Sequence, residues 1–554
     1  MIIQQPEWQH PVVYPVPETV LSVSSPQIDL CGVWSLARNP EGSYWLRSEQ
    51  QKITWADTVV PGDLSAARKR RGTWAKEQLV YRKEIDIPQD FAGMHILLRF
   101  EGSYGMTRVW ADGQFVASHA DGFITWYGDL TGFVTAGQPC LLTIAIENNN
   151  DDVSGFNQGG LVRGLSLVAM PDPHLARLHV ETRFDEAYAD ATLSVLLEIA
   201  GCACTAGIHC AADRPENADQ AATEILLELF DPAGAKVLLH RQHLTGVRGQ
   251  RQEKAEHRAE ANVQDRIELP VTRPLKWDAE HPRLYRLQAT LLSGGIPVET
   301  ASRRVGFREI RRIGNRLFVN GDEVKLRGVC RHDISPLNGR TLTDEELRAD
   351  VRLFKEANIN YIRTSHYPPS EAFLDLCDQA GIYVEDEVGL AFIGRSLKYT
   401  EKSPAHTERY LTFMSELIER DRSHPCVLIW SLANESFYGP NFAAINAWAH
   451  REDPSRPTKF SYPMTMQEED EPVDIWSVHY PNFDSDLAKK HDNVSVGFLP
   501  GRDVPVLHDE CTHIPCYNRG EHRRDPAVRV FWGESIRRFW DNIWQTPGAL
   551  GGAI

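Results

Sequence analysis

Apolar and polar residues alternate along roughly the first 307 residues in short stretches typical of β-strands. The alternation is clearest over residues 80–88, 94–102 and 140–148, and turn signals such as Ala-Asp-Gly-Gln at 111–114 separate the stretches. Regular spacing of this kind favours β-sandwiches, and the length allows two of them. Proline interrupts strand pairing near residues 170–173, so we expect the boundary between the sandwiches there.

The period of the pattern changes after residues 305–308. Residues 343–357 carry apolar positions at helical spacing, and Thr343 and Glu346 have the spacing of a capping box. The further elements expected are a strand at 359–363, a helix from Ser370 to Gly381, a strand at 382–384, a helix around 404–422 and a buried strand at 426–432. This alternation indicates a parallel sheet flanked by helices, and the period alone fits both an open doubly wound sheet and a closed (β/α)8 barrel.

Composition narrows the class of protein. The 554 residues include 59 Lys and Arg against 76 Asp and Glu, and this net charge of −17 without a clustered basic face argues against nucleic acid or an anionic membrane as the main partner. No apolar run approaches the roughly 20 residues of a membrane helix, and the first residues lack the basic and apolar regions of a signal peptide. Ten cysteines at irregular spacing indicate reduced thiols. We therefore expect a multidomain protein of the cytoplasm.

Polar side chains follow six of the expected strands. They are His332, residues 363–367, Asp386 with Glu387, Asn434 with Glu435, His479 with Tyr480, and Asp509 with Glu510. Parallel α/β folds place their active sites at the carboxyl ends of the strands, so these groups are expected to meet in one site. Any one of them taken singly fits a strand-end residue satisfied by its own loop, but six in register favour a functional site.

Glu435 and Glu510 are the candidate catalytic pair. Cleavage of a glycosidic bond needs one carboxylic acid to protonate the leaving oxygen and one carboxylate to meet the cationic anomeric carbon. A separation of about 5 Å makes the second group a nucleophile and retains the configuration, whereas roughly 6.5–9.5 Å admits a water and inverts it. The residues alone leave this distance open, as they leave open a structural pairing of either glutamate with Arg or Lys.

Two long segments resemble the signatures of glycoside hydrolase family 2, the group of the β-galactosidases, β-glucuronidases and β-mannosidases. Residues 358–387 (NINYIRTSHYPPSEAFLDLCDQAGIYVEDE) are similar to the first signature and residues 419–436 (ERDRSHPCVLIWSLANES) to the second. A looser similarity covers 80–88, 159–167, 277–287 and 303–310. The resemblance implies a jelly-roll sugar-binding-like sandwich over 1–173, an immunoglobulin-like sandwich over 174–307, and a (β/α)8 TIM barrel over 308–554 that is incomplete at its C-terminus.

The same resemblance implies roles for individual residues. Glu435 would be the general acid/base, and Glu510 the nucleophile of a retaining double displacement through a glycosyl-Glu510 intermediate. Arg363 and Tyr480 would hold the nucleophile, and Asn434 would bind the sugar 2-hydroxyl. The full set of implied substrate-binding residues is His332, Arg363, His366, Asn434, His479, Tyr480 and His513.

Departures from the family pattern bear on the metal and the sugar. Magnesium-assisted β-galactosidases carry a Glu-x-His pair after this Asp-Glu strand end, where this chain has Ala391 and Ile393, so we expect no such metal site and no cofactor. Galactose is nevertheless the first choice of terminal β-linked sugar, because Tyr480 and the spacing from Glu510 to His513 side with that branch. Glucuronic acid is the second choice. A mannosidase is disfavoured, because the stretch WSLANES lacks that branch's usual sequence.

The last residues of the chain indicate an incomplete barrel. Residues 550–554 resemble the opening of the eighth strand, so the final strand end and its helix are expected to be missing and to leave sheet edges exposed.

A carbohydrate is the expected partner, and the sandwich surfaces leave room for a homo-oligomer. The rival from another class is a non-catalytic carbohydrate-binding protein, against which the intact Glu435 and Glu510 argue.

Overall fold

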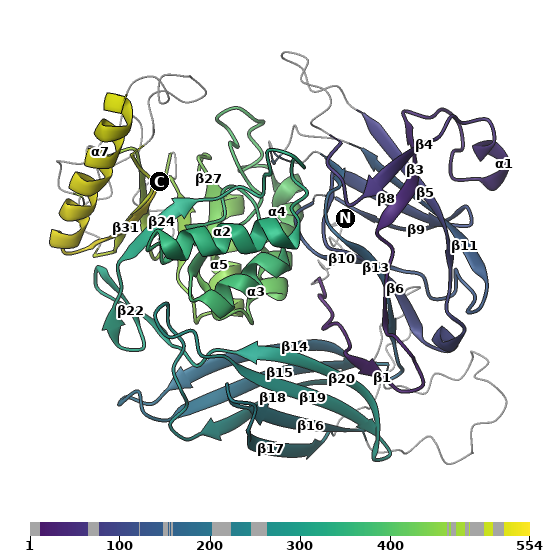
Figure 1. Cartoon of the computed structure of the whole chain (residues 1–554), viewed down its shortest axis with the longest axis horizontal. Coiled ribbons are helices and arrows are strands. Elements are labelled where there is room, and N and C mark those ends of the chain that lie inside the picture. The colour runs from purple at the N-terminus through teal and green to yellow at the C-terminus, as the bar shows by residue number, and fades with distance from the viewer. Residues whose placement is uncertain are drawn as a thin grey trace, which may run out of the picture.

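The chain folds into two β-sandwiches and a barrel that packs against both of them (Figure 1). The computed structural model describes residues 11–64, 77–120, 122–147, 153–154, 156, 159–201, 223–244, 263–462, 465–466, 473–481, 487, 503–512 and 526–554. In Figure 1 the first sandwich is purple to blue, the second lies below the barrel, and the barrel is green with a yellow C-terminal helix. No helix in this part of the chain is both long and apolar enough to cross a membrane.

The first sandwich confirms the strands expected from the alternating pattern. Its six-stranded sheet has the order β4 (Ala56–Val60), β3 (Gly32–Arg38), β5 (Gln78–Asp86), β11 (Pro139–Glu147), β8 (Met106–Ala111) and β9 (Gln114–His119). The four-stranded sheet has the order β10 (Trp126–Asp129), β6 (His95–Phe100), β13 (Leu165–Met170) and β2 (Gln27–Asp29). The expected turn joins β8 to β9 through Asp112 and Gly113, whose φ values of 46° and 83° are those of a two-residue hairpin turn. Trp34, Leu98 and Ile144 are buried between the two sheets.

The second sandwich begins just after the proline-rich boundary at residues 170–173. Its three-stranded sheet has the order β14 (His174–Phe184), β15 (Ala191–Ala200) and β18 (Val263–Val271). The five-stranded sheet has the order β1 (Thr19–Val20), β20 (Ile296–Val305), β19 (Tyr285–Ser293), β16 (Thr223–Phe230) and β17 (Lys236–His243). The N-terminal strand β1 therefore adds to the second sandwich and not to the first, because Thr19 pairs with Thr300 on β20.

The C-terminal half is the expected TIM barrel. Its parallel strands are β24 (Leu326–Cys330), β25 (Tyr361–Arg363), β26 (Tyr383–Glu387), β27 (Val427–Asn434), β28 (Thr458–Ser461), β29 (Trp476–His479), β30 (Val506–Glu510) and β31 (Ala549–Ala553). The helices around it are α2 (Asp344–Glu356), α3 (Glu371–Ala380), α4 (Thr407–Asp421), α5 (Pro440–Glu452) and α7 (Pro526–Gln545). A small sheet of β21 (Ile310–Ile313), β22 (Arg316–Val319) and β23 (Asp322–Glu323) precedes the barrel.

The eighth strand closes its side of the barrel, which the sequence did not indicate. Strand β31 pairs with β24 on one edge and with β30 on the other, so the exposed edge expected here is absent. The gap in the ladder lies between β28 and β29, which form no continuous ladder in the described residues but meet at an isolated bridge between Lys459 and Ile475. The backbone N–H of Ile475 also donates to Thr458 O at 3.2 Å, which keeps these two strands side by side.

The expected helix signals are confirmed where α2 and α3 begin and end. The Thr343 hydroxyl accepts from the Glu346 N–H at 3.2 Å, and Glu346 accepts from the Thr343 N–H at 2.9 Å, which is the capping box. Helix α3 begins after Ser370 and ends at Gly381, whose φ of 69° is the left-handed conformation that glycine adopts without strain. These caps fix where each loop leaves the barrel.

Buried ion pairs join both sandwiches to the barrel. Arg163 of the first sandwich lies 2.9 Å from Asp333, and its guanidinium also donates to Pro368 O at 2.7 Å. Arg177 of the second sandwich lies 2.9 Å from Glu419 on α4. Such charges are stable away from water only when they are paired, so these contacts fix the three parts relative to one another.

Candidate active site

The polar groups at the carboxyl ends of the barrel strands meet around one arginine. Arg363 ends β25 with its side chain fully buried. Its Nη1 donates to Glu510 Oε1 at 2.8 Å, and its Nη2 donates to Asn434 Oδ1 at 2.8 Å. Its Nε and Nη2 also bind Glu387 Oε2 at 3.0 Å and 2.8 Å. One guanidinium thus joins the ends of β25, β26, β27 and β30, as the register of the strand-end residues predicted.

Glu510 is held as a carboxylate anion. The Tyr480 hydroxyl donates to its Oε2, and Arg363 binds its Oε1. Burial on its own raises the pKa of this carboxyl, but its interactions with His479, Arg363 and His366 and the hydrogen bond from Tyr480 outweigh burial and lower the pKa to about 2. Glu510 is therefore ionised at every pH at which the protein is expected to work.

Glu435 follows β27 in a left-handed backbone conformation with φ of 39°. Its N–H donates to Ser461 O at 2.9 Å, and its Oε1 lies 3.0 Å from His479 Nδ1. The guanidinium of Arg395 contacts its other oxygen, Oε2, in an ion pair. A non-glycine residue seldom adopts this conformation, and here hydrogen bonds on both the backbone and the side chain hold it.

The two candidate carboxylates lie close together on either side of His479. An oxygen of Glu435, a ring nitrogen of His479 and an oxygen of Glu510 all lie within 4.8 Å of one another. His479 Nδ1 is 3.0 Å from Glu435 Oε1 and 3.7 Å from Glu510 Oε2. Its Nε2 lies 3.1 Å from Ser461 Oγ, which fixes the ring between the two acids.

The wall of the site contains two neutral histidines. His366 Nδ1 lies 2.9 Å from Glu387 Oε1, and burial lowers the pKa of His366. His332 packs edge-on against His366 with ring centroids 5.3 Å apart, and burial, helped by the nearby Arg340 and Arg363, lowers the pKa of His332 to about 3. Phe156 of the first sandwich packs within 5.8 Å of both rings, so that sandwich forms part of the wall. His513 lies outside the described residues.

The structure adds residues that the sequence pattern missed. Lys459 and Ser461 on β28 both contact Asp509, and Lys459 Nζ lies 2.7 Å from Glu385 Oε1. All of these side chains are buried, so Lys459 balances two carboxylates directly behind Glu510. The sequence analysis expected no strand at residues 458–461, so it had no strand end at which to look for these side chains. Arg395 lies in a loop and carried no signal.

The positions at which the family's magnesium pair was sought do not fit a metal. Ala391 and Ile393 are buried and have no ligand atoms. The ligand atoms of Glu435, His479 and Glu510 are close enough to share a cation, but the guanidinium groups of Arg363 and Arg395 already contact the two carboxylates. The cations beside these acids are therefore supplied by side chains.

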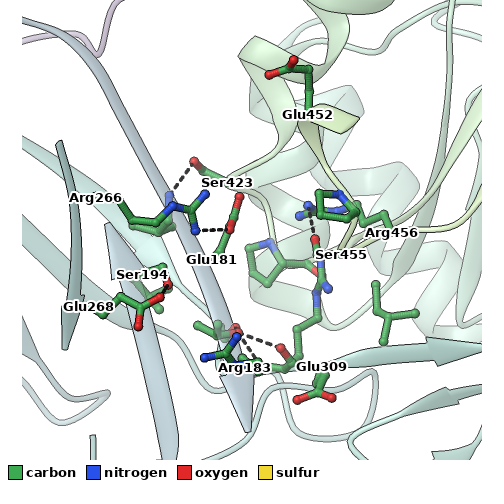
Figure 2. Close-up of a pocket in the computed structure, with 18 of the residues that line it drawn as sticks. Glu181, Arg183, Ser194, Arg266, Glu268, Glu309, Ser423, Glu452, Ser455 and Arg456 are labelled. Atoms are coloured by element: carbon green, nitrogen blue, oxygen red, sulfur yellow. Dashed lines mark hydrogen bonds and ion pairs between the residues drawn. The ribbon is translucent and has the colours of Figure 1, made fainter. Parts of the chain in front are cut away.

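A polar cavity of about 510 Å³ lies away from this site, between the second sandwich and the barrel (Figure 2). Its charges are largely paired with one another. Glu181 lies 3.0 Å from Arg266, and Glu452 lies 3.0 Å from Arg451. These pairs account for its polar lining as part of the contact between the two modules.

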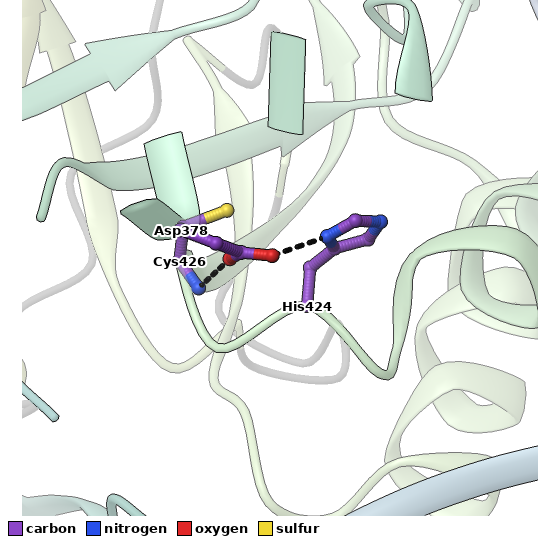
Figure 3. A group of neighbouring side chains, drawn as sticks. All are labelled: Asp378, His424 and Cys426. Carbon is purple, nitrogen blue, oxygen red and sulfur yellow. Dashed lines mark hydrogen bonds and ion pairs between the residues drawn. The ribbon is translucent and has the colours of Figure 1, made fainter. Parts of the chain in front are cut away.

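A second cluster away from the site lies where the loop enters β27 (Figure 3). Asp378 Oδ2 lies 2.6 Å from His424 Nδ1, while Asp378 Oδ1 accepts from the Cys426 N–H at 2.9 Å. Burial raises the pKa of the Cys426 thiol well above its usual range, so the sulfur stays protonated and is a poor metal ligand. The cluster ties α3 to the start of the strand that carries Glu435 at its other end.

Comparison with known families covers most of the chain. Residues 48–171 match the sugar binding domain of glycosyl hydrolases family 2, residues 174–308 match the following domain of the same family, and residues 309–517 match its TIM barrel domain. The chain belongs to glycoside hydrolase family 2. The three matched domains occur in the order that the resemblance implied, so the predicted architecture is confirmed.

Similar curated proteins of family 2 are named β-galactosidases. A β-galactosidase of Aeromonas hydrophila is 32% identical over 389 residues, which are 69% of this chain and 35% of that protein. A β-galactosidase of Alteromonas mediterranea is 29% identical over 424 residues, which are 75% of this chain and 38% of that protein. This chain therefore spans little more than a third of the length of these relatives.

The solved structures that are similar to this chain include two β-glucuronidases. That of Bacteroides uniformis has a TM-score of 0.76 at 21% identity and covers 95% of this chain and 64% of its own. The β-glucuronidase of Dictyoglomus thermophilum has a TM-score of 0.71 at 20% identity, and the match covers 95% of this chain and 90% of that chain. At this identity the two structures support the family 2 fold alone.

Proposed function

We propose that the protein is a retaining exo-β-glycosidase in which Glu435 is the general acid/base and Glu510 is the nucleophile. The observation that carries the proposal is the spacing of the two carboxylates, which have oxygen atoms within 4.8 Å of each other. Retaining glycosidases hold their carboxyl groups about 5 Å apart, whereas inverting enzymes need roughly 6.5–9.5 Å to admit a water between acid and base. The spacing favours direct attack by Glu510 on the anomeric carbon.

The reaction proceeds in two displacements. In the first, a Glu510 oxygen forms a bond to the anomeric carbon, the glycosidic C–O bond breaks, and the Glu435 proton passes to the leaving oxygen. In the second, Glu435 accepts a proton from water, whose oxygen bonds to the anomeric carbon as the ester bond to Glu510 breaks. Arg363 and Tyr480 stabilise the Glu510 carboxylate before attack and after its release.

The sugar lies against the remaining predicted residues. Asn434 Oδ1 accepts from Arg363, while its Nδ2 is buried and has no hydrogen-bond partner among the described residues. A buried donor without a partner is costly, which supports the assignment of Nδ2 to the sugar 2-hydroxyl. His332 and His366, both neutral, offer a polar wall without a charge.

Galactose is the sugar we propose first, because the curated relatives named above are β-galactosidases. Glucuronic acid is the second candidate, since the two solved structures named above are β-glucuronidases. That the protein forms a homo-oligomer and that it resides in the cytoplasm both remain predictions.

Hydrolysis of p-nitrophenyl β-galactoside, β-glucuronide, β-glucoside and β-mannoside by the purified chain tests the function. Turnover of the galactoside well above the others is expected. Turnover of the glucuronide instead would change the sugar but keep the mechanism. Binding of a sugar with no turnover of any, from a chain shown to be folded, would favour the non-catalytic carbohydrate-binding protein.

Azide distinguishes the two catalytic roles. In Glu510→Ala, azide fits the space left by the carboxylate and attacks from that face, which gives an α-glycosyl azide. In Glu435→Ala, with a 2,4-dinitrophenyl leaving group that needs no acid, azide attacks the glycosyl-Glu510 ester from the opposite face and gives the β-glycosyl azide. The same anomer from both variants would contradict the assignment.

A further inference from the structure

Both oxygens of the proposed acid/base are already occupied in the protein without substrate. Oε1 of Glu435 lies 3.0 Å from His479 Nδ1, and the Arg395 guanidinium contacts Oε2. The Glu435 side chain is only 12% exposed, whereas that of Arg395 is 44% exposed. A half-exposed arginine therefore covers the second oxygen of a largely buried acid.

This ion pair conflicts with the first chemical step. Arginine keeps its charge at all working pH values, and a cation in contact with a carboxylate favours the ionised form. An ionised Glu435 has no proton to give to the leaving oxygen. Arg395 must therefore withdraw from Oε2 before the glycosidic bond can break by the proposed route.

The loop that carries Arg395 is fixed, so withdrawal is a movement of the side chain. The Ile393 N–H donates to Ser436 Oγ at 3.0 Å, and the Phe437 N–H donates to Ile393 O at 2.9 Å. The Phe392 N–H donates to Asn434 O at 3.0 Å. These bonds tie the residues just before Arg395 to the strand end that carries Glu435, whereas the half-exposed guanidinium can swing outward.

The position of the ion pair between Arg395 and Glu435 indicates which group takes the place of Glu435 beside Arg395. His479 Nδ1 lies 3.0 Å from Glu435 Oε1 and 3.7 Å from Glu510 Oε2, whereas Arg395 contacts the other oxygen of Glu435, Oε2. In the proposed reaction Glu435 protonates the leaving oxygen, so the leaving group lies beside Glu435 and within reach of the arginine that contacts its Oε2. Glu435 is the one carboxylate paired with Arg395 within the described ranges. A planar anionic group on the leaving group would match the guanidinium fork equally well.

We propose that Arg395 is a specificity-determining residue that binds an anionic group on the leaving-group side of the substrate, and that this exchange of partners frees Glu435 to carry its proton. The inference rests on the proposed function of Glu435. The preferred substrate is then a β-glycoside whose leaving part bears a carboxylate or similar oxyanion, such as an acidic saccharide or an aromatic acid.

Two matched substrates test the inference, 4-carboxyphenyl β-galactoside and its neutral 4-carbamoylphenyl analogue, which differ in charge and little in shape. The quantity measured is kcat/KM for the carboxyphenyl substrate divided by kcat/KM for the carbamoylphenyl substrate. This ratio is compared between the parent chain and Arg395→Gln, so that the intrinsic reactivity of the leaving groups cancels. We expect Arg395→Gln to lower this ratio about tenfold or more. Arg395→Lys should keep part of the preference, and added salt should weaken it.

The control variant is Arg348→Gln on the exposed surface of α2, which removes the same charge and should leave the ratio unchanged. A ratio that Arg395→Gln does not alter would overturn the inference while leaving the glycosidase function intact. If the parent chain hydrolyses neither substrate nor any sugar of the panel, the proposed function fails instead. Calorimetric binding of the two sulfur-linked analogues then decides: tighter binding of the acid that Arg395→Gln abolishes supports the inference, and equal binding or none overturns it.

Discussion

Arg363 and Glu510 form a buried hydrogen-bonded ion pair, with Nη1 donating to Oε1 at 2.8 Å. The same guanidinium binds Glu387, whose side chain is fully buried as well. Two carboxylates therefore share one guanidinium, and removing it would leave both without this cation in a site of low dielectric. The charge state of the nucleophile thus depends on a residue from a strand that is not its neighbour in the barrel.

Replacement of Arg363 by methionine should destabilise the protein by about 3–5 kcal/mol, because it leaves buried carboxylates without their partner. Arg363→Lys keeps the charge but cannot reach Glu510, Glu387 and Asn434 together, so we expect a folded protein whose kcat falls by about 100-fold or more. Thermal unfolding and steady-state kinetics measure the two effects. A lysine variant with parent kcat would show that the fork geometry of Arg363 is dispensable.

Replacement of Tyr480 by phenylalanine removes the hydroxyl that donates to Glu510 Oε2. A hydrogen bond to a charged group contributes about 1.5–3 kcal/mol, so kcat/KM should fall roughly 10- to 100-fold. The hydroxyl helps to hold the pKa of Glu510 at about 2, so its loss raises that pKa and moves any acid limb of kcat/KM that reports Glu510 toward neutral pH. Tyr399→Phe, an exposed tyrosine, should change neither quantity.

Much of the fold was predictable because it depends on local patterns. The capping box of Thr343 and Glu346, the glycine end of α3 at Gly381 and the hairpin turn after β8 were expected from residues close together in the chain. Periodicity could not separate an open sheet from a barrel, because strand closure depends on pairing between distant segments. The resemblance to family 2 supplied that information.

The site was predictable only where it follows strand ends. Glu435, Glu510, Arg363 and His479 each come directly at the end of a strand, and they do meet. Lys459 was missed because no strand was expected at residues 458–461, and Arg395 because its contact with Glu435 spans a loop without periodicity. Distances and ion pairs of this kind depend on the three-dimensional arrangement and leave no mark on sequence spacing.

The contact between the first sandwich and the barrel should affect both stability and substrate binding. Arg163 lies 2.9 Å from Asp333, which directly follows His332 in the wall of the site. Arg163→Met leaves the buried Asp333 with Arg331 as its remaining cation, and we expect a loss of about 3 kcal/mol. Because His332 shifts with its neighbour, KM should rise several-fold with a smaller change in kcat. Equal KM in both proteins would show that the sandwich supports the barrel without shaping the site.

The pair of Asp378 and His424 should make stability depend on pH at the base of β27 (Figure 3). Burial opposes a charge on His424, but the neighbouring Asp378 and then Asp421 outweigh it and raise the pKa of His424 above its ordinary 6.5. The charged form is thus favoured in the folded state, so the stabilisation is fully present below about pH 6.5 and is lost as the pH rises through the folded-state pKa.

We therefore expect the thermal midpoint of the parent chain to fall between about pH 6 and pH 9 by more than that of His424→Gln, which has no group to lose its proton. Asp378→Asn should remove the same pH dependence, since the imidazolium then lacks its partner. His281→Gln is the matched control, because His281 forms a similar pair with Asp278 at 3.1 Å but is 57% exposed and should contribute little. A pH dependence that survives unchanged in His424→Gln would place its origin elsewhere in the fold.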